Sequence, residues 1–158
     1  MMNEVSPIKI IDFCLKNLDH TVLVNTWGEK AIFYNPNGSL KRGIYVLTVK
    51  EKDGANDKSS HLDREAIFRV NIGIKKTTFT NMFGAIPKRP SAGNVIDMNF
   101  DFTEINKIIP HPVYGWMAWV CVLNPSELLF EQFKSLIFES YQLAVEKYKL
   151  KYETEIDE

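Results

Sequence analysis

Residues 68–74 read FRVNIGI, and this stretch decides which fold the 158-residue chain can adopt. Phe68, Val70 and Ile72 alternate with polar or small residues, which is the two-residue period of a β-strand with one apolar face. Arg69 and Asn71 therefore emerge together on the opposite face. The alternation predicts a sheet that other elements cover on its apolar side.

The helix that covers this strand is predicted near the carboxy terminus. Asn124 is a suitable N-cap, Pro125 fits the first helical position, and Glu127 completes a pattern that resembles a capping box. A broad apolar stripe follows, made of Leu129, Phe133, Leu136, Ile137, Tyr141, Ala144, Val145 and Tyr148. At about 1.5–3 kcal/mol for each large apolar side chain buried, this helix forms a principal wall of the core.

A first helix is predicted over residues 7–17, because Ser6 can cap it and Pro7 suits its first position. Its expected apolar face consists of Ile8, Ile11, Leu15 and Leu18. Further strands are expected over residues 22–27, 30–35, 44–50 and 117–123. Gly28-Glu29 fits a two-residue hairpin turn between the first two of these strands.

The remaining segments are shorter or irregular. A short helix containing Phe79 and Phe83 is expected to end at Gly84. A helical turn is expected over residues 102–109. Residues 51–62 are charged and rich in turn-forming residues, so they are predicted to be an exposed loop, and residues 85–97 are predicted to be a mobile loop in which Lys88 and Arg89 are exposed.

The order of these elements predicts an α+β fold. Strands in succession, without a helix between each pair, favour an antiparallel sheet of about five strands with helices from both chain ends on one face. The length and the lack of a linker favour a single domain over residues 1–150. The acidic residues 151–158 are expected to fray.

Composition limits the possible functions. With 19 basic and 20 acidic residues the formal charge is −1, which gives no general attraction to nucleic acid or to an anionic membrane. The longest apolar run, residues 116–123, is far shorter than the roughly 20 residues of a membrane helix. Cys14 and Cys121 lie in apolar patterns typical of buried free thiols, so we expect a cytoplasmic protein.

No metal or cofactor is predicted. The sequence contains no glycine-rich phosphate loop, nucleophile elbow or zinc-binding motif. The three histidines, His20, His61 and His111, are far apart in the sequence, so they form no local metal-ligand pattern.

Residues 111–119, HPVYGWMAW, are the most unusual segment. His111, Tyr114 and Trp119 could line a pocket, with the histidine as acid or base and the rings stacked on a ligand. Alternatively, the rings belong to the core under the last helix. The core interpretation is favoured, because aromatic clusters at the start of a strand usually lie in the core.

A second candidate surface is the face of the sheet opposite the helices. If this face is open, Arg69 and Asn71 project from it near Trp27 and form a surface for a small molecule or a protein partner. The alternative is a solvated sheet face with an ordinary cross-strand ion pair, which antiparallel sheets commonly show. This plain alternative is favoured.

Several strings resemble a known family. Trp27-Gly28, residues 68–73, HPVYG at 111–115, WVCVLNPS at 119–126 and Ser140-Tyr141 are similar to an uncharacterised family of small bacterial proteins, a domain of unknown function. The resemblance spans nearly the whole chain, to about Tyr148.

The end of the chain is also distantly similar to MmcQ/YjbR-like proteins. There too a tryptophan-bearing strand leads to a last helix with a serine–tyrosine pair, here Ser140-Tyr141. This resemblance implies a frataxin (CyaY)-like sandwich, which agrees with the predicted order of elements. For some of these proteins a DNA-binding role has been suggested, but the resemblance implies no catalytic residues.

Three hypotheses about function follow, and the first is preferred. It is a non-enzymatic module that binds an undetermined small molecule or protein through the sheet face and residues 111–119. The second is a DNA-binding protein of the YjbR-like type that uses Lys75, Lys76, Lys88 and Arg89, with an affinity that falls with salt. The third is an enzyme that uses His111 as acid or base.

Overall fold

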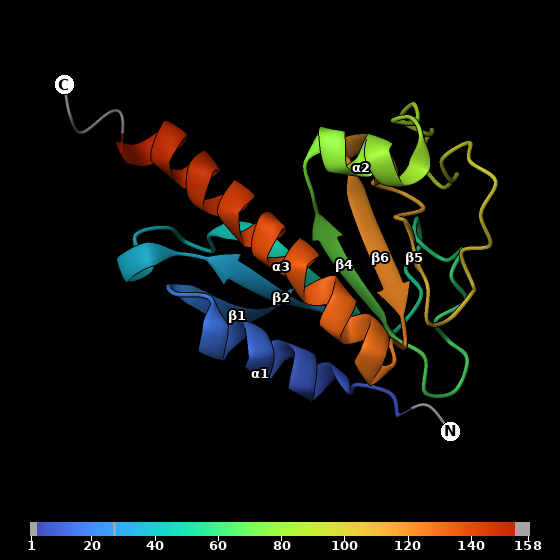
Figure 1. The fold of residues 1–158 in the computed structure, drawn as a ribbon, viewed down its shortest axis with the longest axis horizontal. Helices are drawn as coiled ribbons and strands as arrows, with labels where there is room; N and C mark the ends of the chain where they lie inside the picture. Colours follow the sequence, from blue (N-terminus) through green and yellow to red (C-terminus); the bar gives the residue numbers. More distant parts are fainter. Residues whose placement is uncertain (1–2, 27, 154–158) are drawn as a thin grey trace.

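Six strands form one antiparallel sheet in the part of the chain that the computed structural model describes, residues 3–26 and 28–153 (Figure 1). They are β1 (Thr21–Thr26), β2 (Glu29–Tyr34), β3 (Ile44–Lys50), β4 (Arg69–Gly73), β5 (Ile108–Pro110) and β6 (Trp119–Leu123). Their order across the sheet is β1-β2-β3-β4-β6-β5, and neighbouring strands are antiparallel. The predicted α+β class is therefore confirmed, with six strands in place of about five.

Helices from both chain ends pack on one face of this sheet, as predicted. Figure 1 shows α3 (Glu127–Tyr148) running across the sheet, with α1 (Pro7–Asn17) beside it and α2 (Lys76–Phe83) after β4. Val70 and Ile72 of β4 share one buried core with Phe133 and Ile137 of α3. The chain leaves α3 through one π-helical turn, Lys149–Glu153. No helix in the described ranges is long and apolar enough to cross a membrane.

The buried face of α1 differs from the predicted one. Two residues of the expected stripe are exposed, Ile8 at 67% and Leu15 at 40%. Ile10 and Cys14 are buried instead. The prediction is confirmed for Ile11 and Leu18, which are buried, and wrong for the other two, because α1 carries apolar residues on more than one side and their spacing does not show which side the sheet covers.

Both long helices begin at a serine whose hydroxyl accepts a backbone N–H three residues further on. Ser6 caps α1 as predicted, but the cap of α3 is Ser126 and not Asn124. The side-chain oxygen of Asn124 accepts the backbone N–H of Phe68, and its amide donates to the carbonyl of Ala66. The predicted cap is wrong because these long-range bonds use the asparagine side chain to tie β6 to the segment before β4.

Ser140 fastens α3 to the sheet, and Tyr141 fastens it to the turn before β1. The register between β2 and β3 shifts after Ile32, which leaves Val46 as the extra residue of a β-bulge. The hydroxyl of Ser140 donates to the carbonyl of Val46 at 2.6 Å, and the hydroxyl of Tyr141 donates to the carbonyl of Asp19 at 2.9 Å. The serine–tyrosine pair therefore has a structural role in the described fold.

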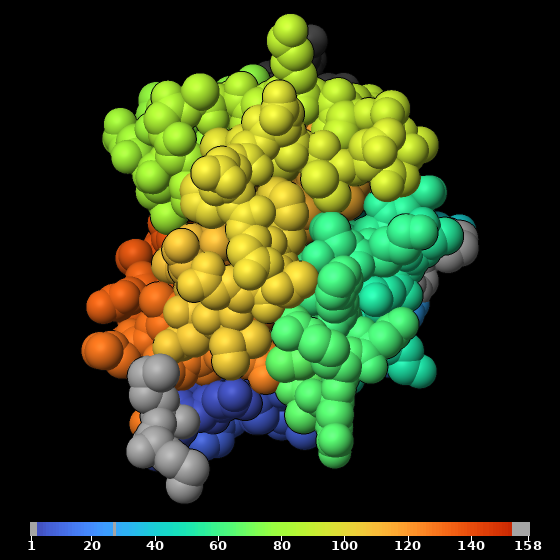
Figure 2. Space-filling model, turned by 90° about the vertical axis from the view of Figure 1, so that its right-hand side faces the viewer, coloured from blue at the N-terminus to red at the C-terminus, as the bar shows by residue number. Residues whose placement is uncertain are grey.

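Two long connections, residues 51–68 and 84–107, cover part of the other face of the sheet. Figure 2 shows them side by side at this end of the molecule, and Arg64 Nη2 donates to the carbonyl of Thr103 at 3.0 Å across their boundary. A smaller core lies under them, made of Leu62, Ile96, Phe102, Ile109, Cys121 and Leu123. The prediction that residues 51–62 form an exposed loop is therefore wrong near its end, where Ser60 and Leu62 are buried.

A strand replaces the helical turn that was predicted over residues 102–109. Ile108–Pro110 forms β5, in which Ile109 pairs with Cys121 of β6. Asn106 has a φ of 55°, which is incompatible with a right-handed helix, and its backbone N–H donates to the carbonyl of Leu123. Pairing with β6 thus overrides the local preference of this segment.

The hairpin between β1 and β2 is shifted by one residue from the prediction. Thr26 pairs with Glu29, so Glu29 belongs to β2 and not to the turn. Gly28 has a φ of 78°, which glycine adopts without strain. The candidate residue Trp27 lies outside the described residues.

Candidate functional site

Arg69 is a fully buried charge on the face of the sheet that points away from the two long helices, with an exposed fraction of 0%. Its Nε donates to Asn71 Oδ1 at 2.7 Å, and its Nη1 donates to Asp57 Oδ1 and Ser60 Oγ, both at 3.0 Å. Its Nη2 donates to Asp57 Oδ2 and lies 3.2 Å from Nε2 of His111. Each part of the guanidinium therefore has a polar neighbour.

Asp57 balances this buried charge. Burial alone would raise the pKa of the Asp57 carboxyl group, but the hydrogen bonds and the positive charge of Arg69 lower it below its usual value. The aspartate is thus ionised and forms a two-pronged ion pair with the guanidinium. Since Asp57 belongs to the connection 51–68, the pair also ties this connection to the sheet.

Asn71 extends the network to β3. Its Nδ2 donates to the hydroxyl of Thr48 at 3.0 Å, and these two residues are partners in the register of β3 and β4. Lys50 is the partner of Arg69 in the same register. The ammonium group of Lys50 lies 3.3 Å from Glu29 Oε1, so each of the two cations has its own carboxylate.

His111 reaches the network from the segment after β5 and is only 2% exposed. Its Nδ1 accepts the backbone N–H groups of Val113 and Tyr114, at 3.1 and 3.0 Å. Burial lowers the pKa of His111 well below its usual value, and the positive charge of Arg69 lowers it further. His111 is therefore a neutral imidazole beside a guanidinium at neutral pH.

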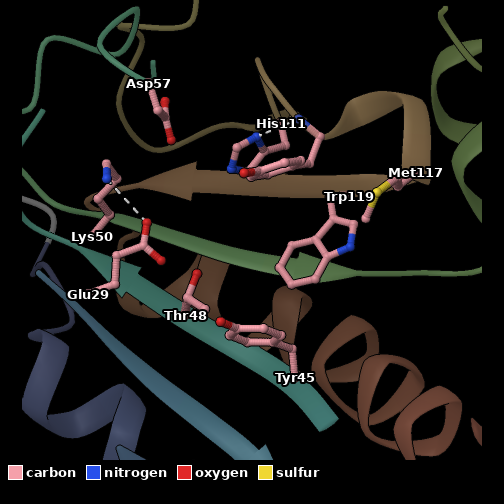
Figure 3. Close-up of a pocket in the computed structure, with 9 residues that line it drawn as sticks. Glu29, Tyr45, Thr48, Lys50, Asp57, His111, Met117 and Trp119 are labelled. Carbon is pink, nitrogen blue, oxygen red and sulfur yellow. Dashed lines mark hydrogen bonds and ion pairs between the residues drawn. The ribbon is translucent and has the colours of Figure 1, made fainter. Parts of the chain in front are cut away.

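A cavity of about 380 Å³ lies over this network (Figure 3). It is lined by Glu29, Tyr45, Thr48, Lys50, Asp57, His111, Tyr114, Met117 and Trp119. Figure 3 shows the charged groups of Glu29, Lys50 and Asp57 on one side of it and the indole of Trp119 on the other. The cavity can therefore receive a molecule with a polar end and a flat apolar body.

The structure places the candidate residues from the sequence in two positions. His111, Tyr114 and Trp119 line the cavity. Arg69 and Asn71 lie buried beneath it and reach it through hydrogen-bond partners that line it. Five residues from two distant parts of the chain are thus brought to one place.

The sequence reasoning missed six of the lining residues: Glu29, Tyr45, Thr48, Lys50, Asp57 and Met117. Thr48 and Lys50 alternate along β3, and this spacing indicates that their side chains share one face of the sheet. Their position opposite Asn71 and Arg69 depends on a strand register that the sequence does not reveal. Nothing in the polar segment 51–62 distinguishes Asp57 from its acidic neighbours.

The basic residues considered for nucleic-acid binding lie elsewhere. Lys75, Lys76, Lys88 and Arg89 are exposed, and none of them lines the cavity. The guanidinium of Arg89 stacks over the ring of Trp116 at 4.7 Å. The carboxylate of Glu139 accepts the backbone N–H of Lys75 at 3.1 Å, so an acidic group occupies the start of α2.

Neither a metal site nor a reactive thiol is present among the described residues. No three His, Cys, Asp or Glu side chains there are placed to hold a metal ion. Cys14 and Cys121 are free and buried, and burial raises the pKa of each thiol to about 12. Both thiols therefore stay protonated near neutral pH, which makes them poor nucleophiles.

The fold and the cavity define a small α+β domain with a polar-aromatic site on the side of the sheet opposite its long helices. The chain belongs to the family of unknown function DUF6194, which matches residues 5–153. The expected membership of an uncharacterised family is thus confirmed. No curated protein and no solved structure matches the chain, and no match supports a similarity to YjbR-like or frataxin-like proteins.

Proposed function

We propose that the protein is a binding module for a small molecule and that the cavity over Arg69 is its binding site. One observation carries the proposal: a charged side chain with no exposure lies under the cavity, with its donors oriented by fixed partners. A buried ion pair contributes little net stability, because desolvation offsets most of its attraction. The presence of this buried charge is better explained by the positions that its hydrogen-bond network gives to Asp57, His111 and Thr48 in the cavity wall.

The size and lining of the cavity support a small molecule over a protein partner. Its volume of about 380 Å³ lies in the range of roughly 300–1,000 Å³ that is typical of small-molecule sites. The rings of Tyr45 and Trp119, with centroids 6.5 Å apart, give it an apolar wall. A protein interface would instead call for an extended surface of about 800 Å² on each partner.

Catalysis has less support than binding. A general acid or base works best when its pKa lies near the working pH. Burial and the charge of Arg69 hold the pKa of His111 well below its usual value, and the carboxylate of Asp57 is engaged by Arg69. The proposal therefore assigns no catalytic residue.

DNA binding of the YjbR-like type also has less support. Arg89 is stacked on Trp116, and Glu139 brings a negative charge to the backbone of Lys75. The chain carries no net positive charge that would draw it to phosphates. Since the two cysteines are buried and free, a reducing compartment such as the cytoplasm is the proposed place of action.

A nuclear magnetic resonance screen tests the proposal. A library of polar and aromatic metabolites is added to ¹⁵N-labelled protein, and the backbone signals of residues 45–50 and 111–119 are followed together with the indole N–H of Trp119. At least one compound is expected to shift these signals together. The shift should vanish in Tyr114→Ala, which truncates a 47% exposed wall residue, and persist in Tyr152→Ala at the end of the last helix. If no compound moves the cavity signals, the proposal fails.

A further inference from the structure

Three N–H groups are directed at the ring of His111. The backbone N–H groups of Val113 and Tyr114 approach Nδ1 at 3.1 and 3.0 Å, and Nη2 of Arg69 lies 3.2 Å from Nε2. A neutral imidazole has one nitrogen that accepts and one that carries a hydrogen. The ring therefore cannot accept on both sides, and one side must present a hydrogen to a donor.

The lone pair belongs on Nδ1. If Nδ1 carried the hydrogen, the backbone N–H groups of Val113 and Tyr114 would lose their acceptor. If Nε2 carries it, only one N–H of Arg69 loses an acceptor. Nη2 of Arg69 already donates to Asp57, so it keeps a partner in either case. Nε2 of His111 therefore carries the hydrogen.

The Nε2–H group has no acceptor in the part of the chain that the structure describes. Figure 3 shows one ring nitrogen of His111 in the dashed backbone bond and the other turned toward the side of the cavity where Asp57 and Lys50 lie. The hydroxyl of Thr48 adds a second donor, because it accepts from Asn71 and donates to none of the described residues. Among the described residues, neither donor is hydrogen-bonded to an acceptor, although the carboxylates of Glu29 and Asp57 also line the cavity.

The charges around the cavity cancel. Arg69 is paired with Asp57, and Lys50 is paired with Glu29. Thr48, Lys50 and His111 are buried at the polar side of the cavity, and a charged ligand would bring there a charge that no side chain is free to compensate. An uncharged ligand avoids that cost.

The carboxylate of Glu29 adds one acceptor at the polar side. Its Oε1 is bonded to Lys50, and Figure 3 shows the other oxygen pointing toward the side of Thr48. A polar group that both accepts and donates therefore fits this side of the cavity. A primary or cyclic amide has this combination of an oxygen acceptor and an N–H donor.

We infer that the ligand is an uncharged planar amide, whose carbonyl oxygen accepts the Nε2–H of His111 while its ring lies against Tyr45 and Trp119. This inference rests on the proposed function and names the chemical class of the ligand. It explains why a buried histidine keeps a donor at the cavity wall. It also explains why the wall opposite the charged groups is aromatic.

Three compounds of almost the same shape test the inference. Benzamide offers an uncharged carbonyl, benzoate offers a charged acceptor, and benzamidine offers a charged donor without an acceptor. Each is titrated into ¹⁵N-labelled protein while the indole N–H of Trp119 is followed. Benzamide is expected to bind at least tenfold more tightly than either of the others.

Two variants locate the contact. Asparagine in His111→Asn places an oxygen near the position of Nδ1, where it can accept the same backbone N–H groups, but it leaves nothing at the position of Nε2. Benzamide affinity should fall at least tenfold in His111→Asn, whereas benzamidine affinity stays unchanged. The matched control is His61→Asn, which alters an exposed histidine that does not line the cavity.

Each contrary result overturns the inference. Benzamidine binding as tightly as benzamide would exclude the donor role of Nε2, and tighter binding of benzoate would exclude an uncharged ligand. An Nδ1–H signal in ¹⁵N-histidine spectra of the free protein would show the other tautomer. If none of the three compounds binds, the inference fails, whereas the proposed function fails only if the metabolite screen also leaves the cavity signals unmoved.

Discussion

Arg69 in β4 and Asp57 in the preceding connection form an ion pair in which both guanidinium ends contact the carboxylate. The arginine side chain is completely buried, and that of Asp57 is 15% exposed. Among the described residues, Asp57 is the only carboxylate bonded to this cation. The pair therefore connects the stability of the sheet to the position of the connection 51–68.

Removing the negative charge of Asp57 should destabilise the protein strongly. Asp57→Asn leaves the Arg69 cation buried without its countercharge, which costs about 3–5 kcal/mol in comparable pairs. Urea denaturation measures the free energy of unfolding. Glu51→Gln is the control, because it breaks an exposed ion pair with Lys30 and should cost less than about 1 kcal/mol. Equal losses in the two variants would show that the buried charge is compensated in another way.

Mild acid should destabilise the protein through His111. The folded state holds the pKa of this histidine well below the value of about 6.5 that it has in the unfolded chain. The unfolded state therefore binds the proton first, and the stability that is present above pH 6.5 is lost as the pH falls through the folded pKa. The expected slope is about 1.4 kcal/mol per pH unit below pH 6.5.

Unfolding free energies between pH 7.5 and pH 5 test this slope. The slope should largely disappear in His111→Asn and remain in His61→Asn. Asp57 contributes in a separate window, because its lowered pKa gives stability that is lost only below about pH 4. If the free energy of unfolding of His111→Asn still falls with pH at the same slope, the acid sensitivity comes from other groups.

Ser140→Ala should lower the free energy of unfolding by about 1–3 kcal/mol, because it takes the buried donor from the carbonyl of Val46 at the β-bulge. Ser135→Ala is the matched control on the same helix. The hydroxyl of Ser135 is exposed and bonds only within α3, so its removal should change the stability by no more than about 0.5 kcal/mol. Thermal or urea unfolding of both variants gives the comparison, and a neutral Ser140→Ala would contradict the role of this bond.

Gly73→Ala should displace a wall of the cavity. A Cβ at this position would lie 2.9 Å from Nε1 and 3.1 Å from Cε2 of Trp119, so the indole has to move. We expect a loss of about 1–3 kcal/mol in stability and a shifted indole N–H signal. In the control Gly54→Ala, the atom nearest to the new Cβ would be Nζ of Lys50 at 3.2 Å, and this flexible side-chain end can move away. An unmoved indole signal in Gly73→Ala would show that the cavity wall tolerates the added carbon.

The sequence predicted the elements whose stability is decided locally. The alternation of residues 68–74 defined β4, and the apolar stripe after Glu127 defined α3. Gly84, with a φ of 94°, ends α2 as predicted because few other residues adopt this conformation easily. In each case the signal lies within one segment.

The predictions failed where distant segments decide the structure. β5 exists because residues 108–110 pair with β6, and nothing within residues 102–109 signals this pairing. Asn124 is a good cap by residue type, yet its side chain bonds to Ala66 and Phe68. The candidate site shows the same limit, since the contribution of Asp57 depends on how a polar loop folds back on Arg69.

The order of the strands implies an order of assembly. In the described sheet, β5 has β6 as its neighbour, and β6 lies between β5 and β4. Residues 108–110 therefore have no partner strand until the chain has been made to Leu123. During synthesis on the ribosome, a nascent chain that ends before this point holds Arg69 and Asp57 but lacks the strand that frames His111. The cavity over Arg69 can therefore form only late in translation.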